Sequence, residues 1–364
     1  MTGQHRIVVL GAGYAGLAAA RRFAKKGRDA RVTVVDAHAE FVERVRLHQQ
    51  VAGQRIPHWD IRELLERRKI HFVHDRVREL DTVGGRVILD REPALDYDTL
   101  VYALGSAGDS TGVPGVAEYA LSVATPADAR ALPISISGGP VVVVGAGATG
   151  IELAAELAES QPDSRVLLLG SDEPAAWMSP RAQGHVRRVL ERLGVEIRSD
   201  AKVIEVSAAG VRLADGTVVG SAATIWAAGF GVPDLAARAG LAVDGRGRVL
   251  TEPTLRSVSH PDIYAAGDCA VIAGPDGREL RMSCATALPT GKHAADAVIA
   301  RMRGREAADL RFRYVFQCLS LGRRDGLIQF LNADDSPGRT VLTGRTAAWF
   351  KERVVRGAAW AARP

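Results

Sequence analysis

The sequence is poor in cysteine and has no long apolar run. Three cysteines are spread over 364 residues without a CxxC pair or a Cys/His metal-ligand spacing: Cys269, Cys284 and Cys318. This pattern predicts reduced, structural thiols in a cytosolic protein and no metal site. Because no apolar run reaches about 18 residues, we expect no membrane-spanning helix. The chain enters a predicted core strand by residue 6, so we also expect no signal peptide.

The chain also lacks a strong charge of either sign. Its 47 lysine and arginine residues and 42 aspartate and glutamate residues give a formal net charge of +5. We attribute this excess to surface arginine, with affinity for nucleotide phosphates or an anionic membrane surface as the alternatives. Aromatic residues make up 5% of the chain and are not interleaved with basic blocks, which argues against nucleic-acid binding. A length of 364 residues predicts two or three domains.

What the sequence does contain is an apolar strand that runs into a glycine-rich turn. Residues 7–16 read IVVLGAGYAG, and a helical pattern follows as far as Gly27. In such a motif Gly11 makes the tight turn, Gly13 lets a pyrophosphate approach the backbone, and Gly16 lets helix and strand pack closely. The start of the helix would add free N–H groups and a positive dipole for the anion.

A second apolar run, residues 32–35, ends at Asp36. This is where a dinucleotide-binding fold places a ribose-binding carboxylate. Strand, turn, helix and acid together predict dinucleotide binding, whereas a glycine turn without a ligand leaves Asp36 unexplained. For residues 41–50, two interpretations stay open: a surface helix, or a segment that holds Arg46 and His48 against the cofactor. Residues 97–104 form a strand that ends at Gly105, where a ligand ring could come close.

After Pro140 the chain repeats this pattern. Residues 141–150 read VVVVGAGATG, followed by a helical pattern and a strand. Two such units in one chain are a more specific signal than one. Where the first unit has Asp36, the second has Gly170, and residues 223–229 repeat the small-residue strand ending.

Together with residues 254–268, TLRSVSHPDIYAAGD, these motifs resemble the two-dinucleotide-binding-domain flavoproteins of the pyridine nucleotide-disulfide oxidoreductase superfamily. The resemblance covers residues 5 to about 305. It implies an α/β fold in which a Rossmann-like NAD(P)H domain is inserted into a Rossmann-like FAD domain, with a short C-terminal α+β segment. The implied limits are 1–112 and 254–305 for the FAD domain, 113–253 for the NAD(P)H domain and 306–364 for the C-terminal segment.

The resemblance also implies the residues that contact the cofactors. For FAD they are Gly11, Gly13, Tyr14, Ala15, Gly16, Asp36, Ala37, Arg46, Val77, Ala103, Gly105, Gly267, Asp268 and Leu288. For NAD(P)H they are Gly145, Gly147, Thr149, Gly150, Ala228 and Gly229. Asp268 would bind the ribityl or pyrophosphate part of FAD, and the helix running on from Leu288 would point its N-terminus at the flavin pyrimidine.

Disulfide reductases of the superfamily carry a redox-active cysteine pair, or one cysteine just past the first ribose acid, and a long C-terminal domain. This chain has no cysteine from residue 43 to 50, and its C-terminal segment is short. The resemblance therefore disfavours disulfide-reductase chemistry. Residues 150–157, GIELAAEL, resemble type II NADH:quinone oxidoreductases, in which a glutamate at this place lies near the nicotinamide–flavin stack. The resemblance therefore implies a catalytic role for Glu152. The alternative is a solvated or N-terminal helix carboxylate stabilised by the dipole.

The electron acceptor is less well defined. Quinone-reducing members carry a glutamine-rich stretch over the flavin, whereas residues 284–291 read CATALPTG. We expect a quinone-like small molecule. The alternatives are an iron–sulfur protein, oxygen, a biosynthetic quinoid intermediate, or a redox sensor without turnover. Since Gly170 cannot bind ribose hydroxyls and Asp172 and Glu173 would repel a 2′-phosphate, we expect a weak preference for NADH over NADPH.

Residues 346–361 show a helical apolar stripe beside positive charge. The stripe contains Ala347, Phe350, Val354, Ala358 and Ala361, and the nearby cations are Arg345, Lys351, Arg353 and Arg356. This pattern is typical of an interfacial amphipathic helix, and membrane-peripheral members of the family dock with such a tail. We expect a cytoplasmic protein with peripheral contact to the inner face of a membrane. The alternatives are packing on the protein's own body or on a second copy in a homodimer.

Overall fold

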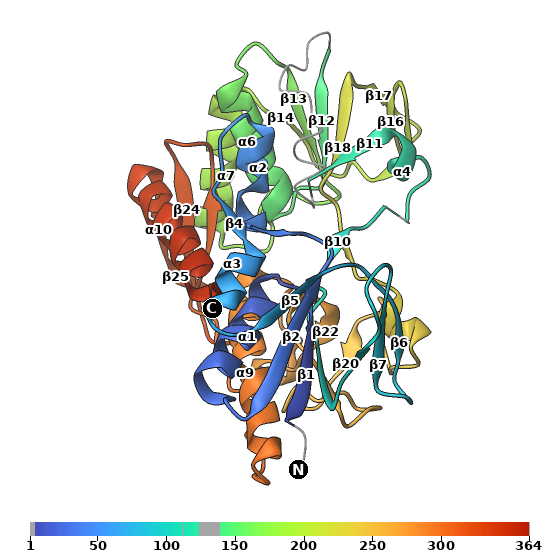
Figure 1. The fold of residues 1–364 in the computed structure, drawn as a ribbon. Helices are drawn as coiled ribbons and strands as arrows, with labels where there is room; N and C mark the ends of the chain where they lie inside the picture. Colours follow the sequence, from blue (N-terminus) through green and yellow to red (C-terminus); the bar gives the residue numbers. More distant parts are fainter. Residues whose placement is uncertain (1–3, 111, 124–138, 364) are drawn as a thin grey trace.

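Two α/β units of the same design lie one above the other in the computed structural model, with the C-terminal segment along their side (Figure 1). The structure describes residues 4–110, 112–123 and 139–363. Both units contain a five-stranded parallel sheet, in the order β21-β9-β1-β2-β5 and β11-β18-β12-β13-β14. The second unit is inserted in the chain of the first. This confirms the predicted α/β fold with two Rossmann-like units.

Each sheet is made of short apolar strands whose side chains are mostly buried, as expected when helices cover the faces of a parallel sheet. The first sheet contains β1 (His5–Leu10), β2 (Ala30–Asp36), β5 (His71–His74), β9 (Thr99–Tyr102) and β21 (Ile263–Ala265). The second contains β11 (Ala120–Ser122), β12 (Val141–Val144), β13 (Val166–Leu169), β14 (Glu196–Arg198) and β18 (Ala223–Trp226).

Helices and small two- and three-stranded sheets complete the two units. The longer helices are α1 (Tyr14–Lys26), α6 (Ala148–Ser160), α7 (Pro180–Arg192) and α9 (Cys284–Met302). The short helices are α2 (Leu47–Val51), α3 (Ile61–Glu66), α4 (Val116–Tyr119) and α8 (Leu235–Arg238), with 3-10 turns η1 (Arg44–Arg46), η2 (Gly267–Cys269) and η3 (Pro275–Gly277). The remaining strands are β3 (Glu40–Val42), β4 (His58–Asp60), β6 (Val77–Asp81), β7 (Arg86–Leu89), β8 (Leu95–Asp96), β10 (Ala107–Gly108), β15 (Val203–Ser207), β16 (Gly210–Leu213), β17 (Val218–Gly220), β19 (Phe230–Gly231), β20 (Val249–Leu250) and β22 (Ala270–Val271).

The chain passes between the units at an antiparallel ribbon formed by β10 and β19. After β19 it packs with the first unit at once, because Leu235, Ala236, Leu241 and Val249 belong to the core that contains β1. The return therefore lies near residue 231, and the predicted return at Thr254 is about 23 residues too late, beyond α8 and β20. The motif at residues 254–268 predicts the return there. The chain crosses earlier, at the glycine-containing strand β19.

The C-terminal segment is an antiparallel sheet of β23 (Phe316–Ser320), β24 (Gly326–Leu331) and β25 (Pro337–Thr343), followed by α10 (Gly344–Ala362). The face of α10 that packs inward contains Ala347, Lys351, Val355, Ala359 and Ala362. The predicted stripe is therefore rotated, and Lys351 lies on the buried face. No helix in the described ranges is long and apolar enough to cross a bilayer.

Two further expectations are corrected by the structure. Residues 41–50 form β3, η1 and α2, with Arg46 and His48 buried, so the surface-helix interpretation is wrong. Helix α9 starts at Cys284, where the hydroxyl of Ser283 accepts the N–H of Thr286, and Leu288 lies inside the helix. In the sequence, Ser283 is a typical N-cap residue and indicates this earlier start of α9.

Candidate functional site

Two of the three glycines after β1 are required by backbone packing, and the third is not. A side chain at Gly11, where φ is +96°, would lie 2.3 Å from the carbonyl oxygen of Ala103, and one at Gly16 would lie 1.8 Å from that of Gly11. Around Gly13, no atom of the described residues outside its own turn lies within 4 Å of a Cβ position. Gly13 precedes α1, whose start has no side-chain cap. Free N–H groups and the helix dipole are thus available to an anion.

The predicted ribose-binding acid lies beside this turn. Asp36 accepts hydrogen bonds from the backbone N–H groups of Ala12 at 2.6 Å and His38 at 2.8 Å. Its side chain remains 17% exposed, so the carboxylate is fixed in direction and still accessible. A hydrogen bond to Asp36 raises the pKa of the His38 ring. Ala37 follows Asp36, and its carbonyl oxygen lies 3.2 Å from Nε2 of His74.

The second unit repeats this arrangement. A side chain at Gly145 would lie 2.8 Å from the carbonyl group of Ala227, and one at Gly150 would lie 1.8 Å from the carbonyl oxygen of Gly145. The space around Gly147 is open to 4 Å, as far as the described residues show. Thr149 lies in the first turn of α6, which has no side-chain cap. The predicted glycines therefore form a second cradle of the same shape.

The two units differ at the acid. In each, the first glycine of the turn donates its N–H to the carbonyl oxygen of the residue before the acid position, at 2.7 Å and 2.8 Å. Gly170 therefore occupies the place of Asp36. A side chain at Gly170 would lie 2.5 Å from the Cβ of Ala146, so the second unit has no room for an acid there.

The ribbon of β10 and β19 brings the strand ends of both units together. Gly105 lies just before β10, and Ala228 and Gly229 lie just before β19. The indole N–H of Trp226 donates to the carbonyl oxygen of Asp109 at 2.8 Å across this crossing. We therefore expect groups bound in the two cradles to meet here.

A buried carboxylate oxygen beside the first cradle has no partner among the described residues. The hydroxyl of Ser106 donates to Oδ2 of Asp268 at 2.7 Å, whereas the buried Oδ1 has no hydrogen-bond partner among the described residues. Gly267 packs against α1, because its side chain would lie 3.0 Å from the Cβ of Ala15. The free Oδ1 suits a hydroxyl donor, such as the ribityl chain of FAD. This unpartnered acceptor therefore fits the predicted FAD.

Arg44, which the sequence did not single out, lies on the same side. Its Nη1 lies 3.8 Å from the Cβ position of Gly105. Burial lowers the pKa of Arg44, and the charge of Asp268 opposes that shift. Among the described residues, Arg44 has no ion pair. No signal in the sequence distinguishes it from Arg46, two residues on in the same 3-10 turn.

Arg46 is occupied by protein groups instead. Its guanidinium pairs with Glu43 at 2.7 Å and Glu352 at 2.6 Å, and contacts Oε1 of Gln49 at 3.3 Å. This differs from the expectation that Arg46 faces FAD. The partner Glu352 comes from α10, about 300 residues later, so the sequence could not show it.

Glu152 is buried in a polar cluster where α6, α2, β23 and α10 meet. Its Oε1 accepts the backbone N–H of Ser320 at 2.9 Å and pairs with the ammonium of Lys351. Its Oε2 lies 3.6 Å from Nδ1 of His48, whose Nε2 lies 3.1 Å from the hydroxyl of Ser320. Glu152 is therefore not solvated, which contradicts that part of the alternative, whereas its place in the second turn of α6 agrees with the helix N-terminal part.

Burial controls ionisation in this cluster. Burial, aided by the charge of Arg46, lowers the pKa of Lys351 to about 7. Burial, together with Lys351 and two arginines, also holds the pKa of His48 well below its ordinary value, so this imidazole is neutral at pH 7. The cluster therefore contains a lysine whose proton can be lost near neutral pH.

The remaining predicted contacts belong to the first unit. Tyr14 opens α1, and its buried hydroxyl has no partner in the described part of the chain. Val77 begins β6, and Leu288 lies in the second turn of α9. Both pack against the core of the first unit.

Comparison with known proteins gives matches over most of the chain. The model of the pyridine nucleotide-disulphide oxidoreductase family matches residues 5–292. An NADH dehydrogenase-like protein of Mycobacterium tuberculosis is 31% identical, over 87% of this chain and 86% of that protein. A type II NADH:quinone oxidoreductase of Staphylococcus haemolyticus is 27% identical, over 96% of this chain and 94% of the other.

A solved structure has the same fold at low sequence identity. NDH2 from Plasmodium falciparum, in complex with NADH, superposes with a TM-score of 0.85 at 14% identity. The match covers 99% of this chain and 96% of the other. At this identity the similarity concerns the fold alone.

Proposed function

Since this chain belongs to the pyridine nucleotide-disulphide oxidoreductase family, we propose that it is a FAD-dependent NAD(P)H oxidoreductase with a quinone-like acceptor. The observation that carries the proposal is the duplicated cradle. Each helix start has an open glycine between two closed ones, Gly13 in the first unit and Gly147 in the second. We assign FAD to the first unit, which has Asp36 and the free oxygen of Asp268, and NAD(P)H to the second.

When bound, FAD would supply hydride acceptance from the nicotinamide and two-electron transfer to the acceptor. The chain's own residues bind and align the reactants. The starts of α1 and α6 would hold the two pyrophosphates, Asp36 would accept ribose hydroxyls, and Oδ1 of Asp268 would accept a hydroxyl of the ribityl chain. The ribbon of β10 and β19 supports alignment of the two bound groups at one crossing.

The cysteines support direct transfer to the acceptor. Burial raises the pKa of Cys284 to about 11 and that of Cys318 to about 12. Both thiols therefore stay protonated at neutral pH, and the nucleophilic thiolate is nearly absent. This argues against thiol chemistry in the transfer.

We propose that Glu152 acts near the nicotinamide, with its carboxylate oriented by Ser320 and Lys351. Glu152→Gln is expected to slow NADH oxidation with a soluble short-chain quinone by about tenfold to a hundredfold, with FAD retained. The matched control is Glu156→Gln. Glu156 is buried one turn further along α6, where it pairs with Arg323 and accepts a hydrogen bond from Gln54.

The measurement is steady-state turnover of both variants and the parent protein. Glu156→Gln should keep parental turnover. Equal kinetics for all three proteins would remove Glu152 from the mechanism. One stoichiometric reduction of the parent, followed by a long-lived charge-transfer complex, would contradict quinone reduction and indicate a sensor.

We propose a weak preference for NADH. Glu173 would repel a 2′-phosphate, but its carboxylate is partly neutralised by Arg187 at 2.8 Å and bound by the hydroxyl of Ser199 at 2.7 Å. We expect kcat/KM for NADH to exceed that for NADPH by about tenfold or less, because tenfold corresponds to only about 1.4 kcal/mol. Equal or higher kcat/KM with NADPH would overturn the assignment.

We propose peripheral membrane contact through residues 346–361. The outward face of α10 carries Trp349 and Trp360, which are 60% and 65% exposed. Arg353 stacks on the Trp349 ring, and Arg356 is also exposed. Exposed tryptophan with arginine is typical of a helix at a membrane interface. We propose the cytoplasmic side of a membrane as the location.

A further inference from the structure

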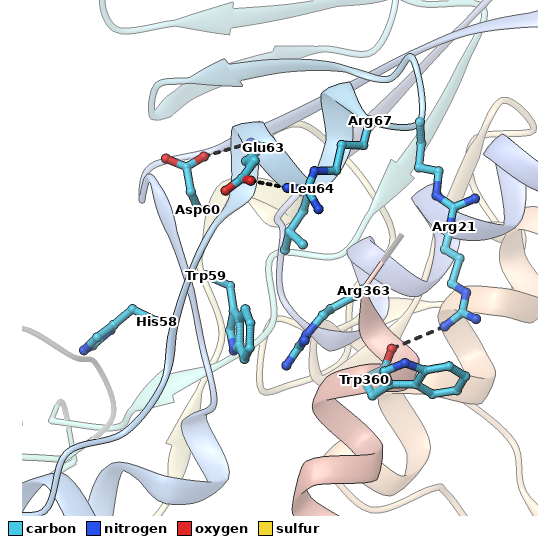
Figure 2. A pocket seen from close by; sticks show the side chains of 10 residues that line it. Arg21, His58, Trp59, Asp60, Glu63, Leu64, Arg67, Trp360 and Arg363 are labelled. Atoms are coloured by element: carbon cyan, nitrogen blue, oxygen red, sulfur yellow. Dashed lines mark hydrogen bonds and ion pairs between the residues drawn. The ribbon is translucent and has the colours of Figure 1, made fainter.

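A cavity of about 760 Å³ lies between the C-terminal end of α10, the middle of α1 and the start of α3 (Figure 2). Its volume is within the range of small-molecule sites. Four arginines and two tryptophans dominate its lining: Arg21, Arg67, Arg68, Arg363, Trp59 and Trp360. Arg21 lies eight residues beyond Gly13, or roughly 12 Å along the helix axis, so the cavity is separate from the first cradle.

The carboxylates of this cavity already have partners. Asp60 accepts the N–H of Glu63 at 2.8 Å as the cap of α3, and Glu63 pairs with Arg67. In contrast, Arg21, Arg68 and Arg363 have no carboxylate partner within the described part of the chain. With four arginines against the two carboxylates of Asp60 and Glu63, the cavity carries a net positive charge.

Two of these arginines are oriented by stacking on indole rings. The Arg363 guanidinium lies 3.2 Å from the centre of the Trp59 ring, and Arg21 lies 5.2 Å from that of Trp360 (Figure 2). Arg21 also donates to the carbonyl oxygen of Ala361 at 2.9 Å. The buried Nε of Arg363 has no acceptor among the described residues. Stacking fixes the plane of a guanidinium and leaves its edge free to bind an oxyanion.

The group that suits such edges is a phosphate ester, and the position of the cavity indicates its source. The cavity adjoins Trp360, on the same outward face of α10 as Trp349. Basic pockets at a membrane surface bind lipid headgroups. We propose that this cavity binds the headgroup phosphate of an anionic phospholipid. The inference rests on the proposed membrane contact. It adds a specific lipid site beside α10, which would otherwise bind the membrane surface without selecting a lipid.

The test uses dihexanoyl-phosphatidylglycerol below its critical micelle concentration, so that no charged surface is present. Calorimetric titration of the full chain should give saturable 1:1 binding. Arg68→Gln/Arg363→Gln should weaken it at least tenfold. The matched control Arg305→Gln/Arg311→Gln removes the same charge from two exposed arginines outside both the cavity and α10, and should bind as the parent does. Equal weakening in both variants would overturn the site.

Two further titrations identify the ligand. The phosphatidylcholine analogue should bind at least tenfold more weakly, because its headgroup carries no net charge. Glycerol 3-phosphate should also bind more weakly, because it lacks acyl chains to contact the indoles. Binding of glycerol 3-phosphate as tight as that of the lipid would replace the lipid by a free phosphate ester and overturn the proposal. NADH oxidation by the parent with a soluble quinone tests the proposed function separately, since its absence would leave lipid binding unaffected.

Discussion

At about pH 6, where Lys351 is protonated, Lys351→Met is expected to lower the free energy of unfolding by about 3–5 kcal/mol, because it leaves the buried Glu152 carboxylate without its cation. The measurement is urea unfolding, followed by circular dichroism. The matched control is Arg353→Met, on the exposed face of the same helix, which should change stability by no more than about 0.5 kcal/mol. A similar small change for Lys351→Met would contradict the ion pair.

The double variant Glu152→Gln/Lys351→Met separates the pair from the packing around it. With both charges removed, neither ion remains unpaired, so the double variant should be more stable than Lys351→Met alone. If the two single effects simply add, Glu152 and Lys351 do not interact.

The lowered pKa of Lys351 also predicts how stability depends on pH. The pKa is about 7 in the folded protein, against an ordinary value of 10.5. Between these values the unfolded chain binds up to one more proton, so the free energy of unfolding should rise with pH by up to about 1.4 kcal/mol per unit. The destabilisation is fully present below pH 7 and is relieved as pH approaches 10.5. The double variant Glu152→Gln/Lys351→Met should lack this contribution. If the free energy of unfolding depends on pH in the same way in the parent and the double variant, the lowered pKa of Lys351 is contradicted.

Gly147→Val is expected to block the coenzyme without unfolding the protein. Gly147 has φ −75°, which a valine can adopt, and no described atom crowds its Cβ position. The added methyl groups would occupy the space where a pyrophosphate approaches the helix. Loss of two charge-assisted hydrogen bonds, about 3–6 kcal/mol, corresponds to a roughly 10²- to 10⁴-fold rise in the KM for NADH. FAD should remain bound.

The same substitution in the first unit is the matched control. Gly13 has φ −75° and an equally open Cβ position, so Gly13→Val should fold and be purified without FAD. The absorbance of bound flavin and the KM for NADH distinguish the two variants. Loss of FAD in Gly147→Val with its retention in Gly13→Val would reverse the assignment of the cradles.

The parts of the fold that the sequence predicts are local. Gly11 and Gly16 are required by atoms within or beside the same βαβ unit, and the acid at Asp36 follows the neighbouring strand. The spacing of these residues in the sequence is therefore enough to predict their roles in the turn. Gly170 could also be placed from the sequence, since the second unit repeats the first.

The parts that the sequence does not predict depend on residues far apart in the chain. The sequence pattern predicts Lys351 on the polar side of α10, because lysine is usually exposed, but its partner Glu152 lies on α6, about 200 residues earlier. For Arg46, nothing nearby in the sequence indicates that its partner is Glu352. Periodicity describes one helix and cannot show what the rest of the chain presents to it.

The most direct test is an anaerobic titration of the purified protein with NADH, followed by visible absorbance, with a short-chain quinone then added. We predict a bound flavin whose absorbance bleaches with one equivalent of NADH and recovers rapidly with quinone. Bleaching without recovery would retain the flavin and coenzyme sites but contradict the acceptor. A protein without flavin, or a flavin that NADH does not bleach, would contradict the proposal that the two glycine cradles hold FAD and NAD(P)H for electron transfer.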